Sequence, residues 1–104
     1  MPYYLVSARP VADRLDDLEA KLNEHAFLKL QPFRRALTAA LEGARRLPDG
    51  TAVWEEEDYC RPPLAEERHA VLDHYFEDVS VELVEHGSGW ERIAELPRLF
   101  PALR

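Results

Sequence analysis

The stretch Tyr-Tyr-Leu-Val-Ser-Ala-Arg at residues 3–9 decides the fold predicted for this chain. It is rich in aromatic and β-branched residues and lies between Pro2 and Pro10, which is typical of a β-strand. Because successive side chains of a strand point to opposite faces, both faces of this strand are mostly apolar. The pattern predicts a strand that is covered on both sides or lies in the middle of a sheet.

Hydrophobic periodicity predicts the elements that follow this strand. They are helices at 13–26, 32–46 and 64–75, strands at 51–59 and 79–86, and a short C-terminal helix at 90–96. We therefore expect a single α+β domain over residues 1–104, a two-layer sandwich with a roughly three-stranded sheet and helices mainly on one face. The first strand is the most apolar, which places it centrally in the strand order 2-1-3. The helical connections are long enough for right-handed crossovers between parallel strands.

The strand at 3–9 resembles the opening strand of small dimeric α+β barrel proteins with a ferredoxin-like repeat. The resemblance covers this strand alone. The two-helix segment at 13–47 and the lack of a predicted fourth strand depart from the pattern of that family. No catalytic residue is carried over from it.

Composition narrows the classes of function. The chain has 104 residues, of which 46% are hydrophobic, and its formal net charge of −7 has the wrong sign for a protein that binds nucleic acid over a broad face. The single cysteine, Cys60, excludes an internal disulfide, so we expect a cytoplasmic protein. No apolar run approaches the roughly 20 residues that span a bilayer, and no export signal is recognisable, so no membrane partner is expected.

An acidic run, Glu-Glu-Glu-Asp at residues 55–58, lies at the end of the predicted second strand. In a strand, Glu56 and Asp58 point to one face, where two close carboxylates could share a proton or hold a hard cation. The alternative is a solvated end of an edge strand, whose charges discourage pairing with other strands. We favour this solvated end, since no further ligand motif accompanies the run.

Arg68 is predicted to lie near the centre of the apolar stripe of the helix at 64–75. A charge in that position is unfavourable unless it is paired, so a carboxylate of the run at 55–58 should meet it. The pair could be structural, or it could anchor an anionic ligand between Arg68, Glu56 and Asp58. We favour the structural pair, because long side chains also reach out of apolar faces.

Candidate catalytic residues are few. His69 and Asp73 share a helical face, where an Asp-supported imidazole can act as a general base, and Tyr59 lies close to them in the predicted pocket. The alternative for His69 and Asp73 is an ordinary surface ion pair. No set of histidines and Cys60 has zinc-ligand spacing, so no metal and no cofactor are expected.

A basic face on the helix at 32–46 suits an interface with an acidic surface. Four arginines make this face: Arg34, Arg35, Arg45 and Arg46. The leading hypothesis is a small protein-association domain that forms a homodimer. The alternative is a small enzyme or a protein that binds an anionic ligand, with its pocket between the third helix and the second strand.

Overall fold

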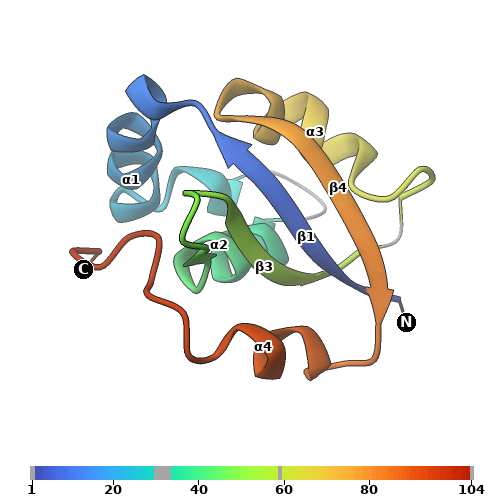
Figure 1. Ribbon diagram of the computed structural model, residues 1–104. Helices are drawn as coiled ribbons and strands as arrows, with labels where there is room; N and C mark the ends of the chain where they lie inside the picture. The colour runs from blue at the N-terminus through green and yellow to red at the C-terminus, as the bar shows by residue number, and fades with distance from the viewer. Residues whose placement is uncertain (1, 30–33, 59, 104) are drawn as a thin grey trace.

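The structure is a computed structural model that describes residues 2–29, 34–58 and 60–103. Strands and helices are mixed along the chain (Figure 1). They are β1 (Tyr3–Pro10), α1 (Leu15–Asn23), α2 (Arg34–Glu42), β2 (Arg45–Arg46), β3 (Ala52–Glu57), α3 (Ala65–Ala70), β4 (Phe76–Val84) and α4 (Ser88–Ile93). Short 3-10 turns at Ala12–Arg14, Ala26–Lys29 and Leu72–His74 flank α1 and α3.

The strands form one antiparallel sheet in the order β2-β3-β1-β4. The predicted α+β class is confirmed, and the three predicted strands stand in the predicted order with β1 in the centre. One detail was wrong, because β2 adds a fourth strand, and all the pairs are antiparallel, so none of the parallel crossovers that the connections would allow is made. With this strand the order of elements becomes βαββαβ, which is the ferredoxin-like arrangement, and α1 and α2 together make its first helical connection.

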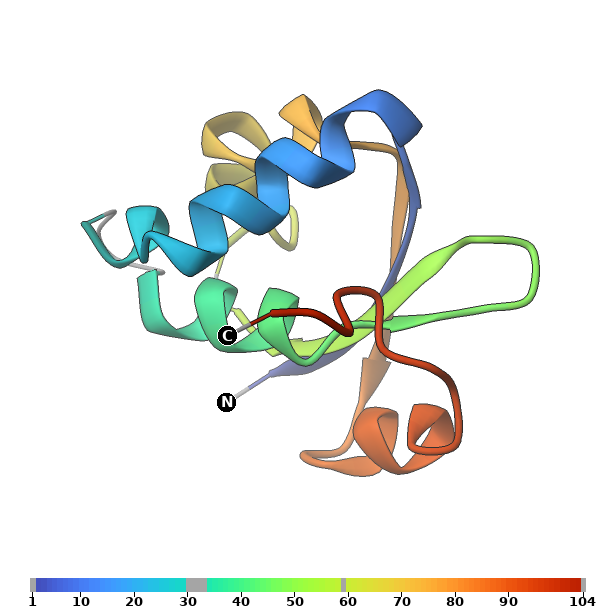
Figure 2. The same ribbon diagram turned by 90° about the vertical axis from the view of Figure 1, so that its left-hand side faces the viewer.

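The main core lies between the sheet and three helices. Figure 2 shows α1, α2 and α3 on one side of the sheet and α4 on the other. Val6 and Ala8 on β1 and Trp54 on β3 point towards the three helices, because alternate residues of a strand share a face. They pack with buried leucines of α1 and α2 and with residues that flank α3: Leu18, Leu22, Leu37, Leu41, Leu64, Val71 and Leu72.

The opposite face of the sheet holds a smaller apolar cluster. Leu5 on β1 and Val53 on β3 pack there against Ile93 of α4. The predicted sandwich had helices mainly on one face and assigned no helix to this one. Instead the chain's own C-terminal segment covers one end of it. None of the described helices is both long and apolar enough to cross a membrane.

The two edges of the sheet differ. At the β2 edge, the C-terminal tail runs alongside, where Arg46 N–H donates to the Pro97 carbonyl at 2.9 Å and Leu99 N–H donates to the Ala44 carbonyl at 2.8 Å. At the opposite edge, no described segment pairs with the outer side of β4. The chain therefore closes one edge of its sheet with its own tail and leaves the other open.

Candidate functional site

The acidic run at the end of β3 is buried. Glu55, Glu56 and Asp58 are only 3%, 2% and 4% exposed, so the predicted solvation of this strand end was wrong. β2 pairs only with Ala52 and Val53, so the acidic half of β3 pairs with β1 alone and is covered by α4 on one face and by α3 on the other. These carboxyls must therefore find partners inside the molecule.

Glu55 holds the beginning of α4. Its carboxylate accepts hydrogen bonds from the N–H groups of Gly87 at 2.8 Å, Gly89 at 2.7 Å and Trp90 at 3.3 Å. A Cβ atom at residue 89 would lie 2.8 Å from Glu55 Oε1, so only glycine allows this close approach. A carboxylate surrounded by N–H groups at the start of a helix is a favourable arrangement, so the role of Glu55 is structural.

Glu56 points to the opposite face and meets Glu67 of α3. Glu56 Oε1 accepts a hydrogen bond from Trp54 Nε1 at 3.0 Å, and the Glu56 and Glu67 carboxyls interact closely enough for a hydrogen bond when one of them is protonated. Burial, the hydrogen bond that the protonated Glu67 carboxyl can donate to Glu56, and the charge of Glu56 raise the pKa of Glu67 to about 12, and burial also raises the pKa of Glu56. Glu67 is therefore protonated at neutral pH, and no donor beyond the neighbouring carboxyls reaches its oxygens.

Asp58 lies beside this pair and holds the turn that leads into α3. Its Oδ2 accepts hydrogen bonds from the N–H of Leu64 at 2.7 Å and the N–H of Cys60 at 3.0 Å. Partial burial and the nearby Asp58 raise the pKa of the Cys60 thiol, which disfavours the reactive thiolate. Glu56, Asp58 and Glu67 thus form one buried acidic cluster. Among the described residues, no group of three or more ligating side chains is arranged to hold a metal ion.

Arg68 lies on the surface rather than in this cluster. Its Nε is 3.5 Å from Asp73 Oδ1, and the two side chains are 46% and 56% exposed. The predicted burial was wrong because α3 spans only Ala65–Ala70 and follows Leu64 in a left-handed conformation, so the apolar residues do not follow one continuous helical stripe. Glu67 takes the buried position instead.

The predicted pocket is not assembled by the described residues. Glu56 and Asp58 come together in the interior, whereas Arg68 and His69 are exposed and Asp73 pairs with Arg68. Tyr59 lies outside the described residues. The spacing of Glu67, three residues after Leu64 and four before Val71, was a signal for its burial, but the same helical wheel also admitted Arg68.

The predicted basic face is divided between two elements. α2 ends at Glu42, so Arg45 and Arg46 belong to β2 and not to the helix of Arg34 and Arg35. Arg45 Nη1 donates a hydrogen bond to the Leu96 carbonyl at 2.8 Å, which ties β2 to the C-terminal tail. Arg35 is exposed, and the side chain of Arg34 lies outside what the structure describes, as does the predicted helix start at Pro32.

The open edge of β4 is a second candidate site, which sequence reasoning missed. Within the described chain, the large exposed hydrophobic residues are Leu28, Val81 and Leu83, and two of these belong to β4. Val81 lies opposite Val6 and Leu83 opposite Tyr4, so both point to the helix-covered face but stand at its rim. The hydrophobic pattern predicted a strand at 79–86, but it could not show that this strand would stand at the open edge.

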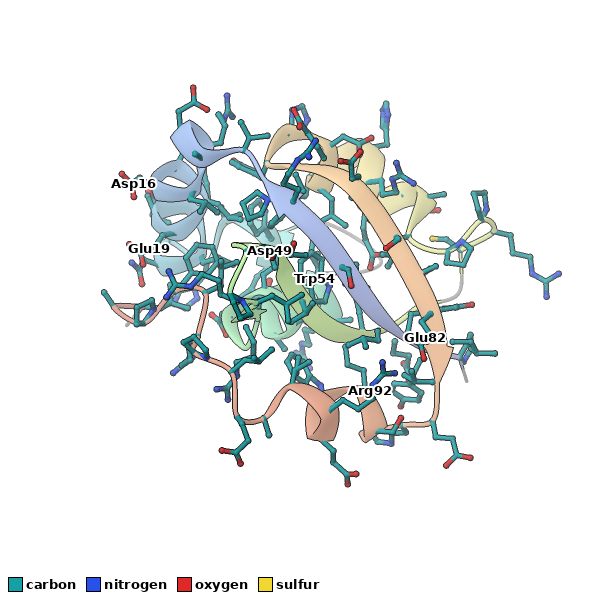
Figure 3. All side chains as sticks on the ribbon, in the orientation of Figure 1. Asp16, Glu19, Asp49, Trp54, Glu82 and Arg92 are labelled. Atoms are coloured by element: carbon teal, nitrogen blue, oxygen red, sulfur yellow. The ribbon has the colours of Figure 1, made fainter. Side chains whose placement is uncertain are left out.

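The acidic residues of β4 are paired within the chain. Arg9 Nη2 lies 3.2 Å from Glu77 Oε2 and 2.8 Å from Asp78 Oδ2. Figure 3 shows Arg92 beside Glu82, where Arg92 Nη1 is 2.8 Å from Glu82 Oε2. The open edge thus carries apolar side chains and neutralised charges.

Comparisons of the chain with protein-family models, curated proteins and solved structures found no match.

Proposed function

We propose that this chain is a protein-association domain and that its contact surface is the outer edge of β4. The observation that carries the proposal is the exposure of Val81 and Leu83, 39% and 68%, on a nine-residue strand with no described neighbour on its outer side. An edge strand presents unpaired N–H and C=O groups, to which an extended strand of another protein can add. The partner strand would carry an apolar residue at every second position.

Edge strands are usually protected against such pairing, and β4 is protected only at its beginning. Asp78 has a positive φ of 53°, and the register between β1 and β4 shifts at this point, which is a β-bulge. A bulge disrupts the ladder locally. From Val79 to Val84 the strand has neither a proline nor a lysine to discourage pairing. This second half of β4 is therefore the part that we assign to the partner.

The alternative function, an enzyme or a protein that binds an anionic ligand, has less support. It depended on a buried Arg68 beside Glu56 and Asp58, and the exposed ion pair with Asp73 removes that arginine from the site. A cluster of three carboxyls disfavours an anion. The cytoplasmic location stays a prediction.

A synthetic peptide with the sequence of residues 77–85 tests the proposal, because it supplies an extended strand of matching pattern. We expect saturable changes in the backbone amide NMR signals of Val79–Val84 as this peptide is added to dilute protein. The control is the same peptide with lysine in place of Val81 and Leu83, which should have no effect. Equal effects of both peptides, changes confined to other elements, or no change at all would reject the β4 edge as a contact surface.

A further inference from the structure

We infer that the partner of the β4 edge is a second copy of this chain, bound across a two-fold axis beside Val81, so that two four-stranded sheets join into one. This inference rests on the proposed function of the β4 edge. A two-fold axis requires a surface that is complementary to itself. The question is therefore whether β4 fits its own antiparallel copy.

The open part of β4 has a symmetric pattern. Val79-Ser80-Val81-Glu82-Leu83 reads apolar, polar, apolar, polar, apolar from either end. In an antiparallel pair centred on Val81, this residue faces its own copy, and Val79 faces Leu83 of the second copy. Opposite side chains of an antiparallel pair lie on the same face of the sheet and about 5 Å apart. The axis would therefore bring together three apolar pairs on the helix-covered face.

The charges select this register over its neighbours. With the axis beside Val81, Glu82 faces Ser80, which can donate a hydrogen bond to it, and Asp78 faces Val84. With the axis beside Ser80, Asp78 would face Glu82, and with the axis beside Glu82, that residue would face its own copy. Like charges directly opposite each other destabilise a strand pair. Between Asp78 and Val84, only the register at Val81 keeps acidic residues apart. Glu77 would face Glu85 in this register, but Glu77 precedes the β-bulge and Glu85 follows the end of β4.

The intramolecular ion pairs lower the remaining repulsion. Each acidic side chain of β4, namely Glu77, Asp78 and Glu82, is paired with Arg9 or Arg92 of its own chain. These are exposed pairs that add little to stability, but they cancel charge beside the open edge. No described strand pairs with the outer side of β4, although α3 and the loop before it lie beside one half of the strand in Figure 1.

Light scattering and sedimentation equilibrium test whether the chain pairs with itself. We expect twice the monomer mass of 12.0 kDa at high micromolar concentration. Leu83→Lys should raise the dissociation constant by roughly tenfold or more, because each dimer contains this contact twice. The matched control is Leu28→Lys, which charges the exposed leucine away from β4 and should leave the mass unchanged. A monomer at this concentration, or equal effects of the two substitutions, would overturn the inference.

Spin labels test the register. In a Cys60→Ser background, single labels at Ser80, Glu82 and Val84 avoid the face that carries Val79, Val81 and Leu83. The axis at Val81 requires equal distances between the two labels of a dimer at positions 80 and 82, and a longer distance at 84. The strand offset grows by about 7 Å for each residue away from the axis. A shortest distance at Ser80 or Glu82 alone would overturn the inferred register.

The outcomes separate the two proposals. If the peptide of residues 77–85 binds β4 while the chain stays monomeric, the β4 edge keeps its proposed function and its partner is another protein. If the chain dimerises and Leu83→Lys has no effect, the dimer uses another surface and the inference fails, while the peptide experiment still decides the assignment of β4.

Discussion

The two edges of the sheet differ in how they are protected against pairing with another chain. Both expose backbone groups that could pair with another chain. At β2 the C-terminal tail supplies the partner groups through Pro97 and Leu99, whereas at β4 the chain supplies only a bulge and three acidic residues that its own arginines neutralise. The same chain covers its β2 edge with its own tail but has no described segment that pairs with the outer side of β4. This difference supports the proposal that β4 is kept open for a partner.

The largest expected effect comes from opening the closed edge. Phe100 is 3% exposed and anchors the tail in the main core. Phe100→Ala should lower the free energy of unfolding by about 3–5 kcal/mol, as expected for a buried phenylalanine. Chemical denaturation measures this loss, and amide hydrogen exchange at Arg46 and Leu99 should accelerate. Ala102→Ser, at an exposed position two residues later, should change stability by less than about 0.5 kcal/mol.

A second prediction concerns the buried carboxyl of Glu67, which lies in the interior and not at either edge of the sheet. Folding raises the pKa of Glu67 from 4.5 to about 12, so its stabilising contribution is greatest below pH 4.5 and is lost as the pH rises. The contribution of Glu67 to the free energy of unfolding should fall steadily above that pH, by about 3 kcal/mol at pH 7. Glu67→Gln should match the wild type near pH 4, exceed its stability at pH 7, and flatten the profile. A variant with an unchanged slope would contradict this assignment.

The attachment of α4 to the sheet can be loosened by one methyl group. Gly89→Ala places a Cβ atom 2.8 Å from Glu55 Oε1, so the carboxylate or the helix must shift. We expect a loss of about 1–3 kcal/mol, which is typical of overpacking. Ser88→Ala is the control, since it removes only a hydrogen bond to the Glu85 carbonyl. Equal losses from both substitutions would show that α4 is not held through Glu55.

The smallest effect on folding is expected at the open edge. Leu83 is 68% exposed, so Leu83→Thr should change the free energy of unfolding of dilute protein by less than about 0.5 kcal/mol. The same substitution should weaken self-association. A large loss of stability in dilute protein would mean that Leu83 serves the monomer, and the contrast between the two edges would disappear.

Much of the central architecture could be predicted from the sequence, because it depends on periodicity. Val6 and Ala8 on one face of β1 and Leu5 on the other already required cover on both sides. β2 could not be predicted, since it has only two residues, both arginines, and follows directly on a helical pattern. β2 is held by the C-terminal tail, as in the hydrogen bond from Arg45 to the Leu96 carbonyl, which joins residues 51 positions apart.

The candidate sites were predictable only in part. The acidic run at 55–58 was correctly singled out, but the partners of Glu55 are backbone groups at residues 87–90, which no local pattern indicates. The sequence predicted burial of Arg68, whereas the structure buries Glu67, because α3 is short and begins after a left-handed residue. The open β4 edge depends on strand order, so it became visible only when the whole sheet was known.

The protonated Glu67 also changes the charge that the folded molecule carries. The formal net charge of −7 counts every carboxyl as ionised, so the folded chain at neutral pH is one unit less negative than its unfolded form. Unfolding must therefore release a proton to the buffer. The heat of unfolding then includes the ionisation heat of that buffer, and calorimetry in phosphate and in Tris should give two different enthalpies for the same transition.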